Sequence, residues 1–427
     1  QSRVISEIQT DLQRSYPMMR LVQGDVGSGK TLVAAFNILQ VADKNLQSVL
    51  MAPTEILSFQ HYNGLKPFCD LIGVKIGLLT GSSKTPARRI IHEQLESGEL
   101  QIIIGTHALL EDKVKFKNLG LAIIDEQHRF GVAQRSKLWK KNACPPHILV
   151  MTATPIPRTL AMSVYGDLDI SVIDELPAGR KPIKTVHRYD TKRLKVIGFI
   201  RDEISKGRQI YIVYPLINES ETLDFKDLMD GYEGIVRDFP MPNYQVSMVH
   251  GQMKPADKEF EMQRFVKGET HIMVATTVIE VGVNVPNASV MIIESAERFG
   301  LSQLHQLRGR VGRGSEQSYC ILMTSHKLGE NSKTRMETMV HSSDGFEIAE
   351  VDLKLRGPGD MMGTQQSGVL ELKIANIVKD KDILSLARHW AKKTLDVDPK
   401  LSDPKHRPIA QTYVKMGKYK NIWNYIS

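Results

Sequence analysis

The sequence predicts an α/β chain made of two tandem units with parallel sheets, followed by a helical C-terminal part. Short apolar runs rich in Val, Ile, Leu and Met recur along the chain, with helical patterns between them. Such runs are typical of buried parallel strands joined by helical crossovers. After about residue 325 the pattern changes to the period of amphipathic helices, which predicts the third part.

In the first unit six apolar runs predict strands, and Thr31–Val41 and Pro86–Leu95 predict helices between them. The unit is expected to end near Leu176–Pro182, because the prolines and the glycine there interrupt both a helix and a central strand. The six strand runs are Arg20–Gln23, Ser48–Ala52, Lys75–Leu79, Ile102–Ile104, Leu121–Ile124 and Ile148–Met151.

The same alternation resumes after this break and predicts a second parallel sheet. Apolar side chains at helical spacing then predict a helix around Phe346–Leu353, which Gly357-Pro358-Gly359 should stop abruptly, and another over Asp382–Leu395. We therefore expect domains over residues 1–178, 179–327 and 328–427. The strands of the second sheet are expected at Gln209–Tyr214, Gln245–Val249, Ile272–Ala275 and Val290–Ile293.

The composition is that of an ordinary globular protein with a modest excess of positive charge. Of the 427 residues 41% are hydrophobic, and 56 Lys and Arg against 48 Asp and Glu give a net charge of +8. This excess suits a polyanionic partner such as nucleic acid but does not prove one. No run of 18 apolar residues occurs, so we expect no transmembrane helix.

The cysteines and the start of the chain bear on its compartment. Cys69, Cys144 and Cys320 are widely spaced and have no Cys or His at metal-ligand spacing, so neither a disulfide framework nor a zinc site is expected. Reduced thiols predict a cytoplasmic protein. Because the chain starts at Gln1 without a charged-then-apolar leader, we expect no signal peptide and a fragment of a longer protein.

The strongest local motif is the stretch Gly-Asp-Val-Gly-Ser-Gly-Lys-Thr, which begins at Gly24. It follows a predicted strand and precedes a predicted helix, the context in which this pattern binds phosphate. Its glycines let backbone N–H groups turn toward an anion at a helix N-terminus. The cation of Lys30 is expected on the β- and γ-phosphates and the Thr31 hydroxyl on Mg²⁺. The expected nucleotide-binding residues are Gly24, Gly27, Ser28, Gly29, Lys30 and Thr31.

A second motif, Leu121–His128, is an apolar strand that ends in two carboxylates. Asp125 is expected to hold Mg²⁺, directly or through water, and Glu126 to orient and deprotonate the attacking water. Alone, such a pair is often only a solvated strand end. Because the pair follows the phosphate loop by about 95 residues, a nucleotide hydrolase is favoured.

A third motif, Gln306–Arg313, places Arg310 and Arg313 three residues apart. A guanidinium that reaches over from a second unit would neutralise the charge that develops on a γ-phosphate. A basic surface loop, or an arginine cluster on nucleic acid, would show the same local pattern. The position of the motif in a second α/β unit favours the arginine-finger interpretation.

In this order, the motifs resemble those of superfamily 2 helicases, in which ATP binds between two RecA-like P-loop domains. Smaller stretches resemble the motifs with which that superfamily tracks a strand, links hydrolysis to movement and contacts nucleic acid from the second domain. These stretches are Ala52–Glu55, Gly105–Leu110, Met151–Pro155, Val249–Gly251 and Ala275–Val283. The resemblance implies two RecA-like domains that use ATP and Mg²⁺.

Other stretches resemble the RecG branch of the superfamily. The longest, Asp344–Asp360, is similar to the translocation motif, a helical hairpin, that RecG shares with the transcription-repair coupling factor; its Leu-Arg-Gly-Pro-Gly-Asp form favours RecG. The resemblance covers the helicase core and the C-terminal part, and no stretch corresponds to the N-terminal wedge domain of RecG. The other matching stretches are Phe130–Val132, Ala153–Arg158, Glu297–Gln306 and Gly363–Gly368.

The resemblance also implies roles for single residues. Gln1 is expected to read adenine, while Gln127, His128 and Gln306 sense the γ-phosphate. The implied catalytic residues are Glu126, Arg310, Arg313 and Gln306, with Asp125, Gln127 and His128 contributing to nucleotide binding. Contacts to DNA are expected at Thr106, His107, Thr152, Thr154, His250, Thr276 and Arg356, the last of which would link the hairpin to the loop that follows it.

The implied function is that of an ATP-dependent DNA helicase or translocase for recombination and repair. Its partners would be branched double-stranded DNA, such as Holliday junctions and stalled replication forks, and single-stranded-DNA-binding protein, but no membrane. Three alternatives stay open: a translocase like the transcription-repair coupling factor, an RNA helicase, and a non-catalytic nucleic-acid-binding module. An extra upstream domain would favour the first, the hairpin argues against the second, and the intact phosphate loop argues against the third.

Overall fold

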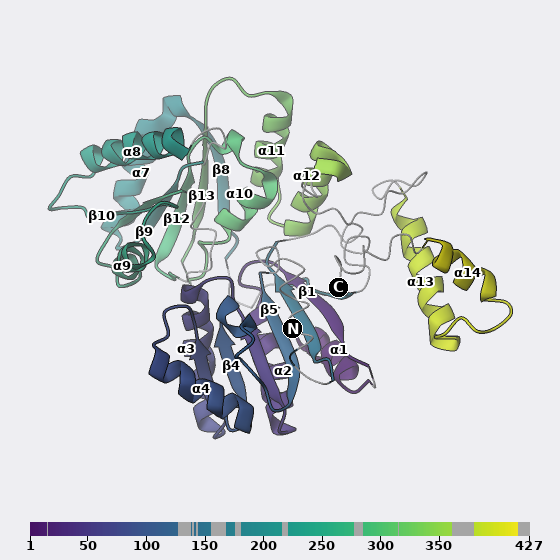
Figure 1. Cartoon of the computed structure of the whole chain (residues 1–427). Coiled ribbons are helices and arrows are strands. Elements are labelled where there is room, and N and C mark those ends of the chain that lie inside the picture. Colours follow the sequence, from purple (N-terminus) through teal and green to yellow (C-terminus); the bar gives the residue numbers. More distant parts are fainter. Residues whose placement is uncertain are drawn as a thin grey trace.

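The computed structural model of the chain describes residues 1–14, 16–126, 138, 141, 144–154, 168–175, 181–215, 221–276, 285–314, 316–360 and 380–416. Within these residues the chain folds into two α/β units, each built on one parallel sheet, with helices from Glu330 onward (Figure 1). The predicted fold class, two tandem parallel-sheet units followed by C-terminal helices, is confirmed.

The first sheet has the strand order β3-β4-β2-β5-β6-β1-β7, and all its pairs are parallel. The six strands expected from the sequence are present. The seventh, β7, was not predicted, because a short edge strand with polar residues carries little apolar signal. The strands are β1 (Met19–Gly24), β2 (Gln47–Met51), β3 (Ile76–Leu79), β4 (Ile102–Gly105), β5 (Leu119–Asp125), β6 (His147–Thr152) and β7 (Asp169–Ile173).

Helices cover both faces of this sheet, which explains why its central strands are apolar without alternation. In β5, for example, Leu121 and Ile123 belong to the core on one face, and Ala122 and Ile124 to the core on the other. The helical elements of the unit are α1 (Ser2–Leu12), α2 (Lys30–Asp43), α3 (Glu55–Leu71), α4 (Thr85–Ser97) and the short 3₁₀ helix η1 (His107–Leu110).

The second sheet has the order β10-β11-β9-β12-β13-β8 and is also parallel. The four expected strands are present, and β8 and β13 were missed. Strand β8 lies at the edge and carries mostly polar side chains, whereas β13 contains an apolar run, Cys320–Met323, that could have been recognised. The strands are β8 (Lys184–Tyr189), β9 (Gln209–Val213), β10 (Val246–Val249), β11 (Ile272–Ala275), β12 (Ala288–Ile293) and β13 (Tyr319–Thr324).

The second unit and the C-terminal part supply the remaining helices. The predicted abrupt stop at Gly357-Pro358-Gly359 is wrong, because α12 continues to Asp360. The φ of proline is compatible with a helix, and its cost is one lost N–H donor. The helices are α7 (Arg193–Ser205), α8 (Glu221–Asp238), α9 (Pro255–Val266), α10 (Leu301–Arg308), α11 (Glu330–His341), α12 (Gly345–Asp360), α13 (Lys381–Val397) and α14 (Arg407–Met416), with 3₁₀ turns η3 (Asp190–Lys192) and η5 (Ala296–Arg298).

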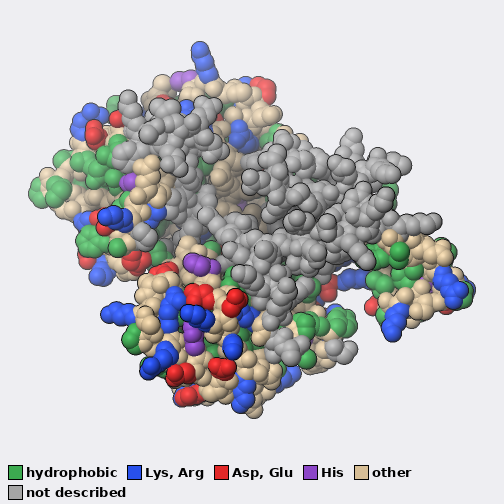
Figure 2. Space-filling view, viewed as in Figure 1, with side chains coloured by type: hydrophobic (Ala, Val, Ile, Leu, Met, Phe, Trp, Pro, Cys, Tyr) green, Lys and Arg blue, Asp and Glu red, His purple; other side chains and the backbone are tan. Residues whose placement is uncertain are grey.

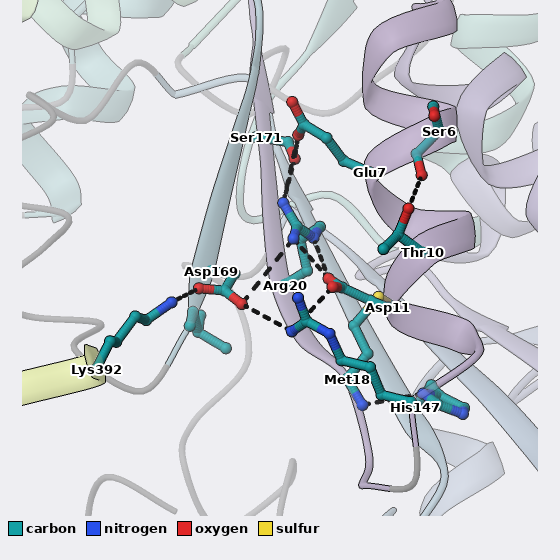
Figure 3. Close-up of polar contacts among 12 residues, drawn as sticks. Ser6, Glu7, Thr10, Asp11, Met18, Arg20, His147, Asp169, Ser171 and Lys392 are labelled. Atoms are coloured by element: carbon teal, nitrogen blue, oxygen red, sulfur yellow. Dashed lines mark hydrogen bonds and ion pairs between the residues drawn. The ribbon is translucent and has the colours of Figure 1, made fainter. Parts of the chain in front are cut away.

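The C-terminal helices attach to different units. Helix α12 packs on α10 of the second unit, where the Ser302 hydroxyl donates to Oδ2 of Asp352 at 3.1 Å. Helix α13 instead reaches the first unit, where Lys392 pairs with Asp169 at the start of β7 (Figure 3). In addition, Arg388 of α13 donates to the carbonyl of Leu168 at 2.7 Å.

The α13–α14 module keeps apolar side chains exposed beside its Lys and Arg residues (Figure 2). On α13 these include Ile383, Leu386 and Trp390. Among the described residues, no helix combines the length and the apolar character that a bilayer crossing needs.

Candidate nucleotide site between the two units

The phosphate-loop motif forms the turn between β1 and α2. Gly27 and Gly29 have φ of 76° and 90°, a left-handed conformation that favours glycine. A Cβ at Gly24 would lie 2.6 Å from Oγ of Ser28, so this glycine is required for close packing. Lys30 donates to the carbonyls of Gly24 at 2.7 Å and Asp25 at 2.9 Å, which holds the loop curled over the N-terminus of α2. The result is a backbone anion site of the expected kind.

Gln1 also contacts this loop. Its Nε2 donates to the carbonyl of Ser28 at 2.8 Å, and a Cβ on Gly29 would meet that same nitrogen at 3.1 Å. The residue expected to read adenine therefore lies against the phosphate loop. Thr31 follows Lys30 in the first turn of α2 and is exposed.

The topology of the sheet brings the two carboxylates to the same edge as the loop. Strand β6 lies between β1 and β5, and register pairs Gln23 with Thr152 and Asp125 with Met151. Glu126, directly after β5, has a φ of 51°, a left-handed backbone conformation that is uncommon for a residue with a side chain. Its Oε2 accepts from the N–H of Ala153 at 3.4 Å.

Asp125 is buried and both of its oxygens accept hydrogen bonds. Oδ1 accepts from the backbone N–H of Glu126 at 3.1 Å, and Oδ2 lies 2.8 Å from Nε2 of His61. His61 is itself buried on α3. This histidine was not singled out from the sequence, since a lone histidine inside a helix has no distinctive pattern.

Burial and neighbouring charges shift the protonation of these groups. Burial lowers the pKa of Lys30, although the carboxylates of Glu126 and Asp125 oppose it. Burial and the charge of Asp125 raise the pKa of Glu126, against the opposing charges of Lys30 and Arg310. For Asp125, burial acts upward, but the hydrogen bond and charge of His61 and the charge of Lys30 outweigh it and leave the pKa below its usual value.

The second unit closes over this site through α10 and the turn that follows it. Nε2 of Gln306 donates to Oγ1 of Thr154 at 2.5 Å, and Nε2 of His305 lies 2.8 Å from Oδ1 of Asp25. Arg310 is buried, and its charge acts on both Lys30 and Glu126 across the boundary. Arg313 is half-buried, and its charge acts on Tyr211 of β9. Arg310 lies just after α10, the helix that contacts Asp25 and Thr154 of the first unit.

All the residues expected to contact DNA except Arg356 lie at or just after the carboxyl ends of strands in the two sheets. Thr152 ends β6, Thr106 follows β4, and His250 and Thr276 follow β10 and β11, whose register pairs Val249 with Ala275. Thr106, Thr152 and Thr276 are buried, whereas His107 is exposed. Burial and the nearby charge of Lys258 lower the pKa of His250.

Some predicted residues lie outside what the structure describes. Gln127 and His128 are outside the described residues, and Arg356 has a described helical backbone but no described side chain. The prediction for each of these three stays a prediction. The second residue that sequence reasoning missed is His305; it directly precedes Gln306 in the same motif, and α10 buries both Leu304 and His305.

Family models match three consecutive parts of the chain. Residues 1–163 match DEAD/DEAH box helicase, residues 191–315 match the helicase conserved C-terminal domain, and residues 342–427 match domain 3, C-terminal, of ATP-dependent DNA helicase RecG. Together they cover most strands of both sheets and helices α12 to α14; β7, β8, β13 and α11 lie between the matched ranges.

Curated relatives named ATP-dependent DNA helicase RecG extend over nearly the whole chain. The Synechocystis protein is 52% identical over 401 residues, covering 94% of this chain and 48% of the relative. The Bacillus subtilis protein is 48% identical over 417 residues, covering 98% of this chain and 61% of the relative. The chain therefore spans about half to three-fifths of the length of these relatives.

Solved structures agree with this assignment. A structure of RecG bound to a three-way DNA junction superposes with a TM-score of 0.74 at 41% identity, covering 90% of this chain and 49% of that one. The DUF1998 helicase MrfA bound to DNA has a TM-score of 0.59 at 18% identity over 79% of this chain and 50% of that one, a likeness of fold alone. From the motifs, the two-sheet fold and these matches, the chain belongs to the RecG family of helicases, of which it carries the helicase part and the C-terminal part.

Proposed function

We propose that this chain is the motor of an ATP-dependent DNA helicase or translocase that acts on branched double-stranded DNA. ATP is hydrolysed between two RecA-like domains, residues 1–178 and 179–327, and residues 328–427 pass the movement to DNA. One observation carries the proposal: helix α10 of the second unit contacts the first unit at the phosphate loop and just after β6, through His305 to Asp25 at 2.8 Å and Gln306 to Thr154 at 2.5 Å, and the buried Arg310 lies just after this helix. An arginine so placed completes the charge complement of a phosphoryl-transfer site when the units are closed.

Each side chain at the boundary has a role in this proposal. The loop N–H groups and Lys30 hold the β- and γ-phosphates, and Gln1 reads the adenine. Glu126 orients the attacking water and takes its proton, a task that a raised carboxyl pKa favours. Arg310 and Arg313 neutralise charge on the γ-phosphate, and Gln127, His128 and Gln306 sense that phosphate.

The residues at the site also fit a magnesium ion. Mg²⁺ prefers oxygen ligands, and Asp125, with its lowered pKa, offers a carboxylate next to Lys30 while Thr31 offers a hydroxyl at the first turn of α2. When bound, Mg²⁺ supplies neutralisation of the phosphate charge. The chain's own contribution is to hold Asp125 in a fixed orientation through His61 and the backbone N–H of Glu126.

The proposed DNA partner is inferred from the relatives of this chain. The solved RecG structure is of a complex with a three-way DNA junction, and we propose the same class of partner here, with replication forks and Holliday junctions as substrates in recombination and repair. Thr106, His107, Thr152, Thr154, His250 and Thr276 contact the DNA backbone, and Arg356 links α12 to the loop after it. Single-stranded-DNA-binding protein is a proposed partner and the cytoplasm the proposed location.

The test compares ATP hydrolysis with a three-way junction, linear duplex, single-stranded DNA and RNA, at two salt concentrations. The junction should stimulate hydrolysis most, and higher salt should weaken stimulation because phosphate contacts release counterions. Displacement of a third strand from duplex DNA measures movement. Lys30→Ala is the inactive control. Equal stimulation by RNA, or no stimulation by any nucleic acid, would contradict the proposal.

A further inference from the structure

A hydrogen bond joins the phosphate loop of the first unit to helix α10 of the second. Oδ1 of Asp25 lies 2.8 Å from Nε2 of His305, and His305 is only 2% exposed. Asp25 is the residue whose backbone carbonyl also accepts from Lys30 at 2.9 Å. The hydrogen bond from His305 therefore reaches the part of the phosphate loop whose conformation Lys30 stabilises.

The second ring nitrogen of His305 settles the direction of this bond. Nδ1 lies 3.0 Å from Nη2 of Arg308, and a guanidinium only donates. Nδ1 must therefore accept, so the ring proton is on Nε2 and is donated to Asp25. The neutral imidazole is fixed in one tautomer between a donor and an acceptor.

Arg308 carries the connection onward to the C-terminal helices. It is buried, and its Nη1 donates to the carbonyls of Met339 at 2.9 Å and Ser342 at 2.8 Å, at the end of α11. Nη2 also donates to the carbonyl of Ser343, just before α12, at 3.4 Å. A continuous set of hydrogen bonds thus runs from the phosphate loop to the junction of α11 and α12.

The two units also approach each other closely beside this bond. A Cβ at Gly309 would lie 2.8 Å from Cβ of Val26, the loop residue after Asp25. Only the absence of a side chain at Gly309 allows the end of α10 to approach the loop so closely. Arg310 is the next residue, so the contacts at Asp25 and Val26 fix where its backbone lies.

We propose that His305 is a positioning residue that fastens the second unit to the phosphate loop in the closed cleft. Its bond to Asp25 places Arg310 at Lys30 and Glu126, and its bond from Arg308 aligns the α11–α12 junction with the same closed state. This inference rests on the proposed function and deepens it, because it names the residues through which closure of the nucleotide cleft is coupled to the C-terminal helices.

A double-mutant cycle on the full chain tests the bond. Asp25→Ala, His305→Ala and the double variant are compared by their affinity for ADP with aluminium fluoride, which mimics the closed transition state, and for ADP alone. Each single variant should lose about fivefold to tenfold affinity for the fluoride complex, and His305→Ala, which leaves the phosphate loop itself intact, should keep its ADP affinity nearly unchanged. The double variant should lose no more than either single variant, since the same bond is removed.

Two further variants keep the result interpretable. His305→Gln keeps an N–H donor and should recover most of the affinity, which also guards against misfolding of the alanine variant. His341→Ala removes an exposed histidine of α11 and should combine additively with Asp25→Ala. Additive losses for Asp25 and His305, or equal losses for ADP and the fluoride complex in His305→Ala, would overturn the proposal.

Hydrogen exchange at residues 339–345 gives a readout that packing alone would not change. In the parent chain the fluoride complex should slow exchange there, and in His305→Ala this nucleotide-dependent protection should disappear. Protection that persists in His305→Ala would overturn the coupling. Because binding and exchange need no turnover, a chain that binds the complex but fails to hydrolyse ATP would fail the proposed function and not this test.

Discussion

The Nε2 atom of His61 lies 2.8 Å from Oδ2 of Asp125, so that helix α3 holds the carboxylate at the end of β5. Groups that orient a metal ligand in this way typically change metal affinity or activity by about 10- to 100-fold when removed. We expect His61→Ala to lower turnover by at least about tenfold and to raise the Mg²⁺ concentration needed for tight nucleotide binding. A magnesium titration of fluorescent nucleotide binding measures the second effect.

The control for His61 is Lys66→Ala on the same helix. Lys66 pairs with Asp70 at 2.8 Å on the exposed side of α3, so its loss should leave turnover and the magnesium requirement close to those of the parent. An unchanged magnesium requirement in His61→Ala would mean that His61 does not orient Asp125.

Glu126→Gln should separate binding from hydrolysis. The amide keeps the size of the side chain and can still accept from the N–H of Ala153, but it takes no proton from water. Nucleotide affinity should change little, while turnover falls by about 10²- to 10⁴-fold. Equilibrium binding and single-turnover hydrolysis are the two measurements. Turnover within a few-fold of the parent would reject Glu126 as the base.

Arg310→Ala should remove a large part of what the second unit contributes to hydrolysis. Arginine fingers account for about 10³- to 10⁵-fold in rate in nucleotide hydrolases. We expect a loss of at least about 10²-fold in kcat, with weaker effects on ADP binding. Arg298→Ala is the matched control, since Arg298 is an exposed arginine of the same unit. Equal loss in both variants would indicate a general effect of charge on DNA binding.

Lys392→Ala should loosen α13 from the first unit. Lys392 pairs with Asp169, but its side chain is 55% exposed, so global stability should fall by about 1 kcal/mol or less. The local effect should be larger, and hydrogen exchange over residues 381–397 measures it. Lys393→Ala is the control, because Lys393 lies 4.8 Å above the Trp390 ring instead. Identical exchange in the two variants would mean that the pair of Lys392 and Asp169 does not hold α13 on the first unit.

Acid should also weaken the pair of Lys392 and Asp169 and so loosen α13 from the first unit. Burial raises the pKa of Asp169, but the hydrogen bond and charge of Lys392, with Arg20 and Arg388, outweigh burial and bring the pKa below its usual 3.8. A carboxyl with a lowered pKa contributes stability that is full above its unfolded value and is lost as the pH falls through the lowered value. Exchange of α13 should therefore rise only below about pH 4 and should approach that of Lys392→Ala. An onset near neutral pH would point to another group.

Much of the fold could be predicted because parallel strands covered on both faces are apolar along their length. Strands β2 and β5 show this plainly. The edge strands β7 and β8 could not be recognised in this way, since polar residues such as Asp169 and Lys184 begin them and pairing on one side suffices. The helix stop predicted at Gly357-Pro358-Gly359 failed because local helix preference is only a weak guide to where a helix ends, and α12 continues to Asp360.

The candidate site likewise contains residues that the sequence alone reveals and residues that it does not. The residues of the phosphate loop, Gly24 to Thr31, follow one another in the sequence, and so do Asp125 and Glu126. The local pattern of each motif therefore indicates its chemistry. His61 and His305 act through partners that lie 64 and 280 residues away along the chain. No local pattern marks such contacts, which arise only when the sheet order and the closure of the units bring distant segments together.

The separate attachments of α12 and α13 give the molecule a mechanical property. Ser302 ties α12 to one unit and Asp169 ties α13 to the other, and residues 361–379 join the two helices. A rotation of one unit against the other would therefore change the distance between the end of α12 at Asp360 and the start of α13 at Lys381.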